Sequence, residues 1–83
     1  MRKINLDGCE IKRTVEGHTY LSRMLEFPVS YGKNLDALYD LLTEIGSDVE
    51  IWISHEGEMD QMMKKVFLDA SNDNEYLKIC LTK

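Results

Sequence analysis

Two aspartates, Asp36 and Asp40, stand four residues apart in the stretch SYGKNLDALYDLL, which covers residues 30–42. In a helix this spacing places both side chains on one face, where two like charges repel by about 0.2–0.5 kcal/mol. Asp36, in the first turn, would be stabilised by the helix dipole, whereas Asp40 lies beyond the reach of that effect. The pattern therefore predicts either a merely solvated acidic face or a face that binds a cationic partner.

Carboxylates can also hold a metal or act as acid catalysts, and Asp69 adds a third acid to this pair. Magnesium, however, is usually bound by one or two carboxylates together with a substrate phosphate in octahedral geometry. No glycine-rich phosphate loop accompanies these acids, because Gly32 stands alone. The sequence thus favours a binding protein over an enzyme, with no metal and no cofactor.

The two cysteines, Cys9 and Cys80, form no CxxC pair and have no nearby pair of histidines. This spacing predicts no metal site, and we expect two free thiols in or beside strands. A catalytic cysteine–histidine pair would require one of them to meet His18 or His55 in space, and no sequence feature argues for that. His18 falls on an apolar stripe, so we expect a hydrogen-bonded structural histidine.

The first helix is predicted to begin after the N-cap Thr14 and to end before Pro28. Gly17 would weaken its first turn by about 1 kcal/mol, so we expect a ragged start. Its buried stripe is predicted to be His18, Leu21 and Leu25, with Met24 beside them.

The second helix carries the two aspartates. Asn34 is its predicted N-cap, Gly32 is expected to allow a tight turn before it, and Gly46 is expected to end it at the C′ position. Its core stripe is predicted to be Leu35, Leu38, Leu42 and Ile45.

Three strands are expected at residues 3–6, 49–54 and 77–82, where apolar and polar residues alternate. A third helix should lie between the last two strands. Its predicted apolar stripe, which we interpret as core packing, is Met59, Met62, Met63, Val66, Phe67 and Ala70.

The order strand, helix, helix, strand, helix, strand implies parallel strands joined by right-handed crossovers. Strands buried on both faces would be apolar throughout, whereas these alternate. We therefore predict a two-layer α/β fold, a three-stranded parallel sheet with helices packed mainly on one face. A chain of 83 residues should form a single domain over residues 1–83.

The formal net charge is −5, from 15 acidic and 10 basic residues. This charge disfavours direct binding to nucleic acid or to an anionic membrane. The beginning of the chain lacks the apolar run of a signal peptide, and no segment is apolar enough to span a bilayer. We expect a cytoplasmic protein that is monomeric when free.

The stretch YGKNLDALYDLL resembles the signature helix of the barstar family, the cytoplasmic inhibitors of secreted bacterial ribonucleases. That family reads roughly aromatic-Gly-x-Asn-Leu-Asp-Ala-Leu-Trp-Asp, with a proline a few residues earlier. The positions that match it here are Pro28, Tyr31, Gly32, Asn34, Leu35, Asp36, Ala37, Leu38 and Asp40. The first strand ending in Asp-Gly and the late helix fit the family as well.

The resemblance implies a protein whose acidic helix and preceding loop enter a cationic ribonuclease active site. Asp40 would be the principal phosphate mimic, Asp36 its neighbour, and Asp69 an acid at the rim. Asn34 would fix the loop and add a polar contact. The partner would be a basic extracellular, barnase-like ribonuclease. The full set of expected partner-binding residues is Ser30, Tyr31, Gly32, Asn34, Asp36, Tyr39, Asp40, Thr43, Glu44 and Asp69.

Three positions depart from the family pattern. Ser30 replaces one of two aromatics before the glycine, Tyr39 replaces the tryptophan before the key acid, and Ile45 replaces another aromatic. Aromatics commonly anchor interfaces, so these changes leave the identity of the partner open. The alternatives are an immunity protein or antitoxin against a different toxin, and an interaction adaptor that uses the same fold.

Overall fold

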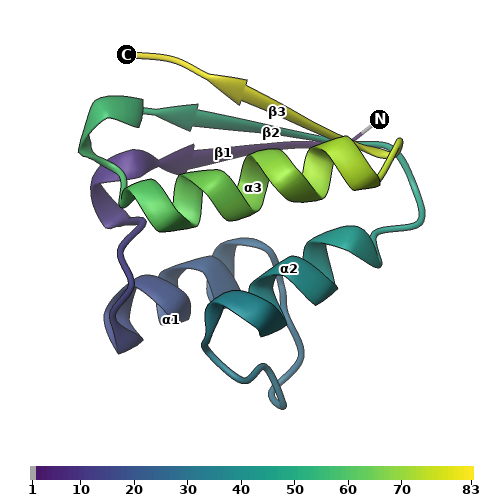
Figure 1. The fold of residues 1–83 in the computed structure, drawn as a ribbon, viewed down its shortest axis with the longest axis horizontal. Coiled ribbons are helices and arrows are strands. Elements are labelled where there is room, and N and C mark those ends of the chain that lie inside the picture. Colours follow the sequence, from purple (N-terminus) through teal and green to yellow (C-terminus); the bar gives the residue numbers. More distant parts are fainter. Residues whose placement is uncertain (1) are drawn as a thin grey trace.

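Three parallel strands form the sheet of this computed structural model, which describes residues 2–83 (Figure 1). They are β1 (Arg2–Asp7), β2 (Val49–Ser54) and β3 (Leu77–Leu81), in the spatial order β1-β2-β3. In the register of the sheet, Ile51 at the centre pairs with Ile4 on one side and Ile79 on the other. The predicted parallel three-stranded sheet is confirmed.

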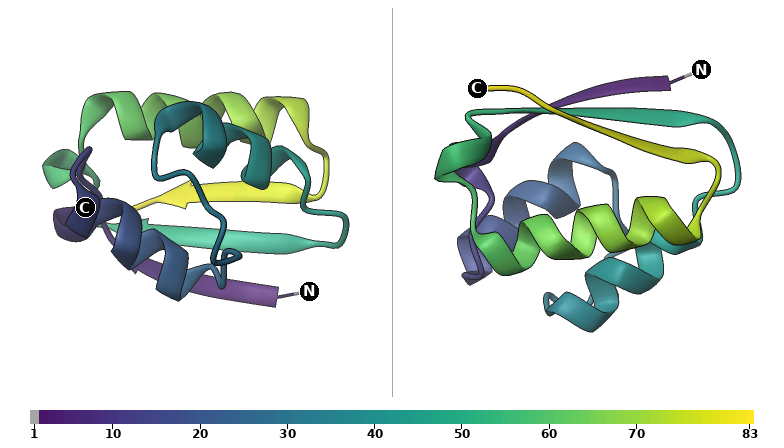
Figure 2. Two further views of the ribbon diagram at one scale, coloured as in Figure 1. Left: turned by 90° about the horizontal axis from the view of Figure 1, so that it is seen from below. Right: turned by 45° about the horizontal axis from the view of Figure 1, so that its top comes forward.

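The helices are α1 (Val15–Met24), α2 (Leu35–Thr43) and α3 (Gln61–Asp73). All three lie on the same side of the sheet, as the edge-on view in Figure 2 shows. Two short 3-10 turns, η1 (Gly8–Glu10) and η2 (Glu56–Glu58), follow β1 and β2 and were not expected. The two-layer α/β architecture is therefore as predicted.

The core lies between the helices and the inner face of the sheet. Its fully buried side chains include Ile51 and Ile53 of β2, Leu38 of α2 and Phe67 of α3. His18 is also buried, as expected of a structural histidine. Met62, however, is 44% exposed, so its place in the predicted core stripe was wrong. It lies in the first turn of α3, where Met63 takes the inward position.

The start of α1 is capped rather than ragged. The hydroxyl oxygen of Thr14 accepts a hydrogen bond from the N–H of Gly17 at 3.1 Å. A Cβ atom at Gly17 would lie 2.0 Å from the carbonyl oxygen of Lys12. The glycine is thus required by the close approach of the preceding chain, and this requirement outweighs its low helix propensity.

Helix α2 ends at Thr43, before the predicted stop at Gly46, which has no positive φ. The terminating group comes from far along the chain. The side-chain amide of Asn74 donates hydrogen bonds to the carbonyl oxygens of Leu42 and Ile45, both at 2.9 Å. Asn74 satisfies carbonyls that the end of a helix leaves free, so no glycine cap is needed.

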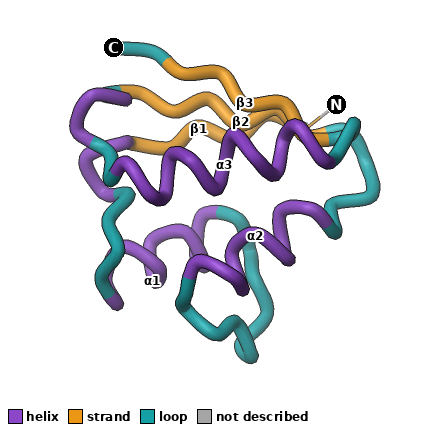
Figure 3. Tube along the Cα trace, in the orientation of Figure 1, coloured by secondary structure: helices purple, strands orange, loops and turns teal. Residues whose placement is uncertain are grey.

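A long loop joins α1 to α2 at the edge of the helical layer (Figure 3). This loop covers residues 25–34 and contains all of the candidate positions that precede α2. Within residues 2–83, no helix has the length and apolar character needed to cross a membrane.

Candidate partner-binding face

Tyr31 fixes the middle of the loop before α2. Its ring is buried, and its phenol oxygen lies 2.6 Å from Nδ1 of the buried His18 on α1. Phe27 packs against the same ring, with the two ring centroids 4.8 Å apart. Burial raises the pKa of Tyr31 to about 12, so the phenol stays neutral. Tyr31 was expected to face a partner, but in the free chain its side chain serves as the anchor of the loop.

Asn34 fixes the end of the loop. Its side-chain oxygen accepts a hydrogen bond from the N–H of Ala37 at 2.8 Å, which caps the first turn of α2 as predicted. Its side-chain nitrogen donates to the carbonyl oxygen of Gly32 at 3.3 Å. Both ends of the amide are therefore used to hold the loop against the helix.

The tight turn between these anchors lies at Lys33 rather than at Gly32. Lys33 has a φ of 52°, in the left-handed region, whereas no glycine has a positive φ. Gly32 lies close to Asn34 instead, and a Cβ atom there would make a tight contact of 3.2 Å with Nδ2 of Asn34. The expectation that Gly32 provides the turn was wrong by one residue.

Asp36 and Asp40 of α2 and Glu44, the residue that follows its last turn, stand at four-residue intervals, and all three are exposed. Among residues 2–83, no side chain donates a hydrogen bond or forms an ion pair to any of these three carboxylates. Their mutual repulsion is thus not relieved within the described chain.

Thr43 lies on the same side but is partly buried, and its hydroxyl donates to the carbonyl oxygens of Tyr39 and Asp40, both at 3.0 Å.

Helix α3 lies beside α2 and adds two further acids (Figure 1). The phenol of Tyr39 donates a hydrogen bond to the carboxylate of Asp73. That bond raises the pKa of Tyr39, and the nearby charges of Asp69 and Asp40 act in the same direction. We call Asp36 and Asp40 of α2, Glu44 at its C-cap, and Asp69 and Asp73 of α3 the acidic face.

Asp69, the expected rim acid, is less free than the acids of α2. Its carboxylate accepts a hydrogen bond from Nζ of Lys65 at 2.8 Å, one turn earlier on α3. Both side chains are more than half exposed, and such surface pairs contribute little to stability. A cationic partner could therefore compete for Asp69 at small cost.

Asp73 is the member of the acidic face that sequence reasoning missed. It stands four residues after Asp69, the same interval that links Asp36 to Asp40. In a helix, that interval places Asp69 and Asp73 on one side of α3. The interval is the sequence signal that could have identified Asp73.

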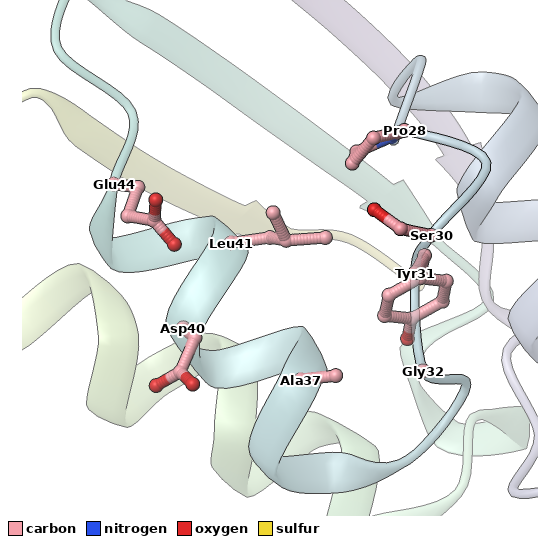
Figure 4. Close-up of a pocket in the computed structure, with 8 residues that line it drawn as sticks. All are labelled: Pro28, Ser30, Tyr31, Gly32, Ala37, Asp40, Leu41 and Glu44. Atoms are coloured by element: carbon pink, nitrogen blue, oxygen red, sulfur yellow. The ribbon is translucent and has the colours of Figure 1, made fainter.

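A shallow cavity of about 180 Å³ separates the loop from α2 (Figure 4). Ala37 and Leu41 point from the helix toward the loop, and Ser30, which is exposed, lies opposite them. Asp40 and Glu44 line the helical side of the cavity. The arrangement combines an apolar floor with carboxylates at its border, which suits a flat cationic side chain of a partner.

Comparison with known proteins bears on what this face does. Residues 1–77 match the family described as Barstar (barnase inhibitor). The chain belongs to the barstar family. A curated relative from Bacillus subtilis (strain 168), named "Putative ribonuclease inhibitor YrdF", is 49% identical over 43 residues. That similarity covers 52% of this chain and 47% of the relative, so the matched part is about half of each.

Membership of the barstar family agrees with how the signature residues are used here. Tyr31 and Asn34 hold the loop, Leu38 is buried in the core, and Asp36 and Asp40 are left exposed on α2. Tyr39, which stands where the family pattern has tryptophan, is tied to α3 through Asp73. In this chain, a hydrogen bond between side chains therefore joins α2 to α3 in addition to their packing in the core.

Proposed function

We propose that this chain is a stoichiometric inhibitor of a basic ribonuclease, which it binds through the acidic face and the loop before α2. The observation that carries the proposal is the exposure of Asp36 and Asp40 without a cationic partner inside the described chain. Barstar membership and the name of the Bacillus relative support the same class of function. The chain would act as a binding protein and not as an enzyme.

The proposed mechanism is phosphate mimicry. A ribonuclease binds the phosphates of RNA with lysine, arginine and histidine side chains. Carboxylates can take the place of phosphate oxygens, and an arginine can bind one with two parallel charge-assisted hydrogen bonds. Asp40 would be the principal mimic, with Asp36 and Glu44 beside it and the acids of α3 at the rim. The repulsion within the acidic face would then be relieved only in the complex.

The rigidity of the loop supports binding without large reorganisation. In the free chain, Tyr31 holds the middle of the loop and Asn34 holds its end. Groups that are already ordered lose less conformational entropy when a complex forms. Ser30, Gly32 and the cavity beside them would thus meet the partner in nearly their final geometry.

The partner that fits best is a secreted bacterial ribonuclease of the barnase type, and the inhibitor would act in the cytoplasm to spare the RNA of the producing cell. An immunity protein against another toxin, or an adaptor built on the barstar fold, would not inhibit RNA cleavage at equimolar ratio. Inhibition therefore separates the proposal from both alternatives.

The test is a titration of RNA cleavage by a basic extracellular ribonuclease such as barnase. The parent chain should abolish cleavage near one inhibitor per enzyme. Asp40→Asn should weaken inhibition by about tenfold or more, because the enzyme would bury cations without their counter-charge. Asp48→Asn is the matched control, since Asp48 is an exposed aspartate outside the acidic face and the charge change is the same.

The control should inhibit like the parent chain. If Asp40→Asn and Asp48→Asn inhibit equally well, the acidic face does not carry the interaction. If the parent chain leaves cleavage unchanged at a large molar excess, the partner is not a ribonuclease of this type and the alternatives become the better explanation.

A further inference from the structure

Three side chains with metal-binding atoms meet at the carboxyl ends of β1 and β2. Asp7 is the last residue of β1, Cys9 lies in η1, and His55 follows β2 directly. One ligand atom from each, an oxygen, a sulfur and a nitrogen, lies within 4.8 Å of the other two. The two 3-10 turns, η1 and η2, lie side by side at this end of the sheet (Figure 1).

The backbone holds the cluster in place. The Asp7 carboxylate accepts a hydrogen bond from the N–H of Cys9 at 2.9 Å, and the same oxygen lies 3.1 Å from Nδ1 of His55. A Cβ atom at Gly8 would lie 2.4 Å from the carbonyl oxygen of His55, so only glycine allows the two strand ends to approach so closely. His55 itself has a φ of 51°, a left-handed conformation that is uncommon for residues other than glycine, although histidine adopts it more often than most.

We propose that Asp7, Cys9 and His55 form a binding site for a single Zn²⁺ ion. Zinc accepts thiolate, imidazole and carboxylate ligands together, and sites with three protein ligands keep one position open for water. Metal–ligand bonds of 2.0–2.3 Å in a tetrahedron imply ligand atoms about 3.3–3.7 Å apart. The present spacing therefore requires movements of only about 1 Å.

The ligands can make that adjustment because they are accessible. The side chain of His55 is 58% exposed and that of Asp7 is 46% exposed. As the zinc–sulfur bond forms, the thiol of Cys9 releases its proton to solvent, and Asp7 keeps its charge. Softer ligands such as sulfur favour zinc over magnesium or calcium, which prefer oxygen atoms alone.

The charges around the cluster favour a cation, because the acidic side chains of Asp7, Glu58 and Glu10 all lie near Cys9. A nucleophilic cysteine has the opposite environment, with a lowered pKa and positive neighbours. The same three residue types therefore suit a metal site better than a cysteine–histidine catalytic site.

The site lies outside the loop and the acidic face proposed to bind a ribonuclease, and it shares no residue with them. The sequence predicted no metal site because its two cysteines form no CxxC pair and have no nearby pair of histidines, and Cys9 and His55 are far apart along the chain. Only the parallel pairing of β1 with β2, which aligns Asp7 with Ser54, brings them together.

The test uses the reduced protein with Zn²⁺ alone, in competition with a chromophoric chelator, and with Co²⁺ as a spectroscopic probe. We expect one metal ion per chain and a thiolate-to-cobalt charge-transfer band. Cys9→Ser should abolish the band, and Cys9→Ser and His55→Gln should each weaken Zn²⁺ binding by about tenfold or more, the loss that even outer-sphere changes can produce.

Cys80→Ser is the matched control, because Cys80 is the other free thiol and lies on β3, at the opposite edge of the sheet from β1. It should keep both the band and the affinity of the parent chain. Circular dichroism would check that each variant is folded. The proposal is overturned if the parent chain shows no thiolate band, or if Cys9→Ser and His55→Gln bind Zn²⁺ as tightly as Cys80→Ser.

Discussion

The phenol oxygen of Tyr31 lies 2.6 Å from Nδ1 of His18, and this contact joins the loop before α2 to the middle of α1. Both residues are almost completely buried, with 7% and 4% of their surface exposed. The contact thus links the shape of the proposed binding loop to the stability of the core. The first two predictions follow from it.

Tyr31→Phe should destabilise the chain and weaken inhibition together. The change leaves Nδ1 of buried His18 without its partner, which costs about 1–3 kcal/mol in the free energy of unfolding. The loop would also lose one of its two anchors. Thermal melting and inhibitor titration would measure the two effects, with Tyr76→Phe as the control, since Tyr76 is 42% exposed. Equal melting temperatures for the two variants would contradict the anchoring role.

Stability should decrease as the pH falls through the range where histidine titrates. Burial lowers the pKa of His18, and the charge of Lys33 acts in the same direction. Because the folded pKa lies below the unfolded value, the unfolded chain binds protons more readily. The contribution of His18 is therefore fully present above about pH 6.5 and is lost below it.

Melting temperatures between about pH 7.5 and 5.5 would test this dependence. Asp7 also has a lowered pKa, but its contribution changes near and below its ordinary value of 3.8, outside this window. The His18→Gln variant should show a smaller decrease than the parent chain. A parent chain that becomes more stable on acidification in this window would refute the assignment.

Removing the two N-caps should lower stability to a similar extent but should affect inhibition differently. Thr14→Ala and Asn34→Ala each remove a side-chain cap from a helix, and each should cost about 1 kcal/mol in the free energy of unfolding. Only Asn34 also holds the carbonyl of Gly32 in the loop. We therefore expect weaker inhibition from Asn34→Ala alone, measured by titration at a temperature where both variants are folded.

The strands and the helical layer could be predicted because their patterns are local. Alternation in residues 49–54 and 77–81 matches β2 and β3, since one face of the sheet meets the helices and the other does not. The end of α2 could not be predicted in this way. Its cap is the side chain of Asn74, about thirty residues later, and no local signal at residues 43–46 reveals it.

The candidate site shows the same division between local and distant information. The exposure of Asp36 and Asp40 follows from helical periodicity alone. The burial of Tyr31 depends on the position of His18 in another helix, and the role of Asp73 depends on the packing of α3 beside α2. The cluster of Asp7 with Cys9 and His55 depends on strand pairing, which the spacing of cysteines does not reveal.

The hydrogen bond between Tyr39 and Asp73 should be visible in the titration of the phenol. That bond raises the pKa of Tyr39, and the charge of Asp73 adds to the effect. Asp73→Asn removes the charge and should lower the pKa of Tyr39 toward the ordinary value. NMR of tyrosine labelled at Cζ would resolve Tyr39 from the other tyrosines, and the buried Tyr31, with a pKa of about 12, serves as the internal reference. An unchanged pKa for Tyr39 would show that the hydrogen bond between Tyr39 and Asp73 does not form in solution.

Association with a ribonuclease should slow as salt is added. An acidic face that meets a basic active site attracts it over a distance, and dissolved ions screen this attraction. Dissociation should respond less, because the paired charges are then shielded from solvent. Stopped-flow measurements at low and high sodium chloride would give both rates.

Asp40→Asn should show a shallower dependence of the association rate on salt than the parent chain, since one of the attracting charges is gone. An association rate that is the same at low and high salt would mean that the carboxylates of α2 and α3 do not guide the encounter, and the phosphate-mimicry mechanism would then lose its physical basis.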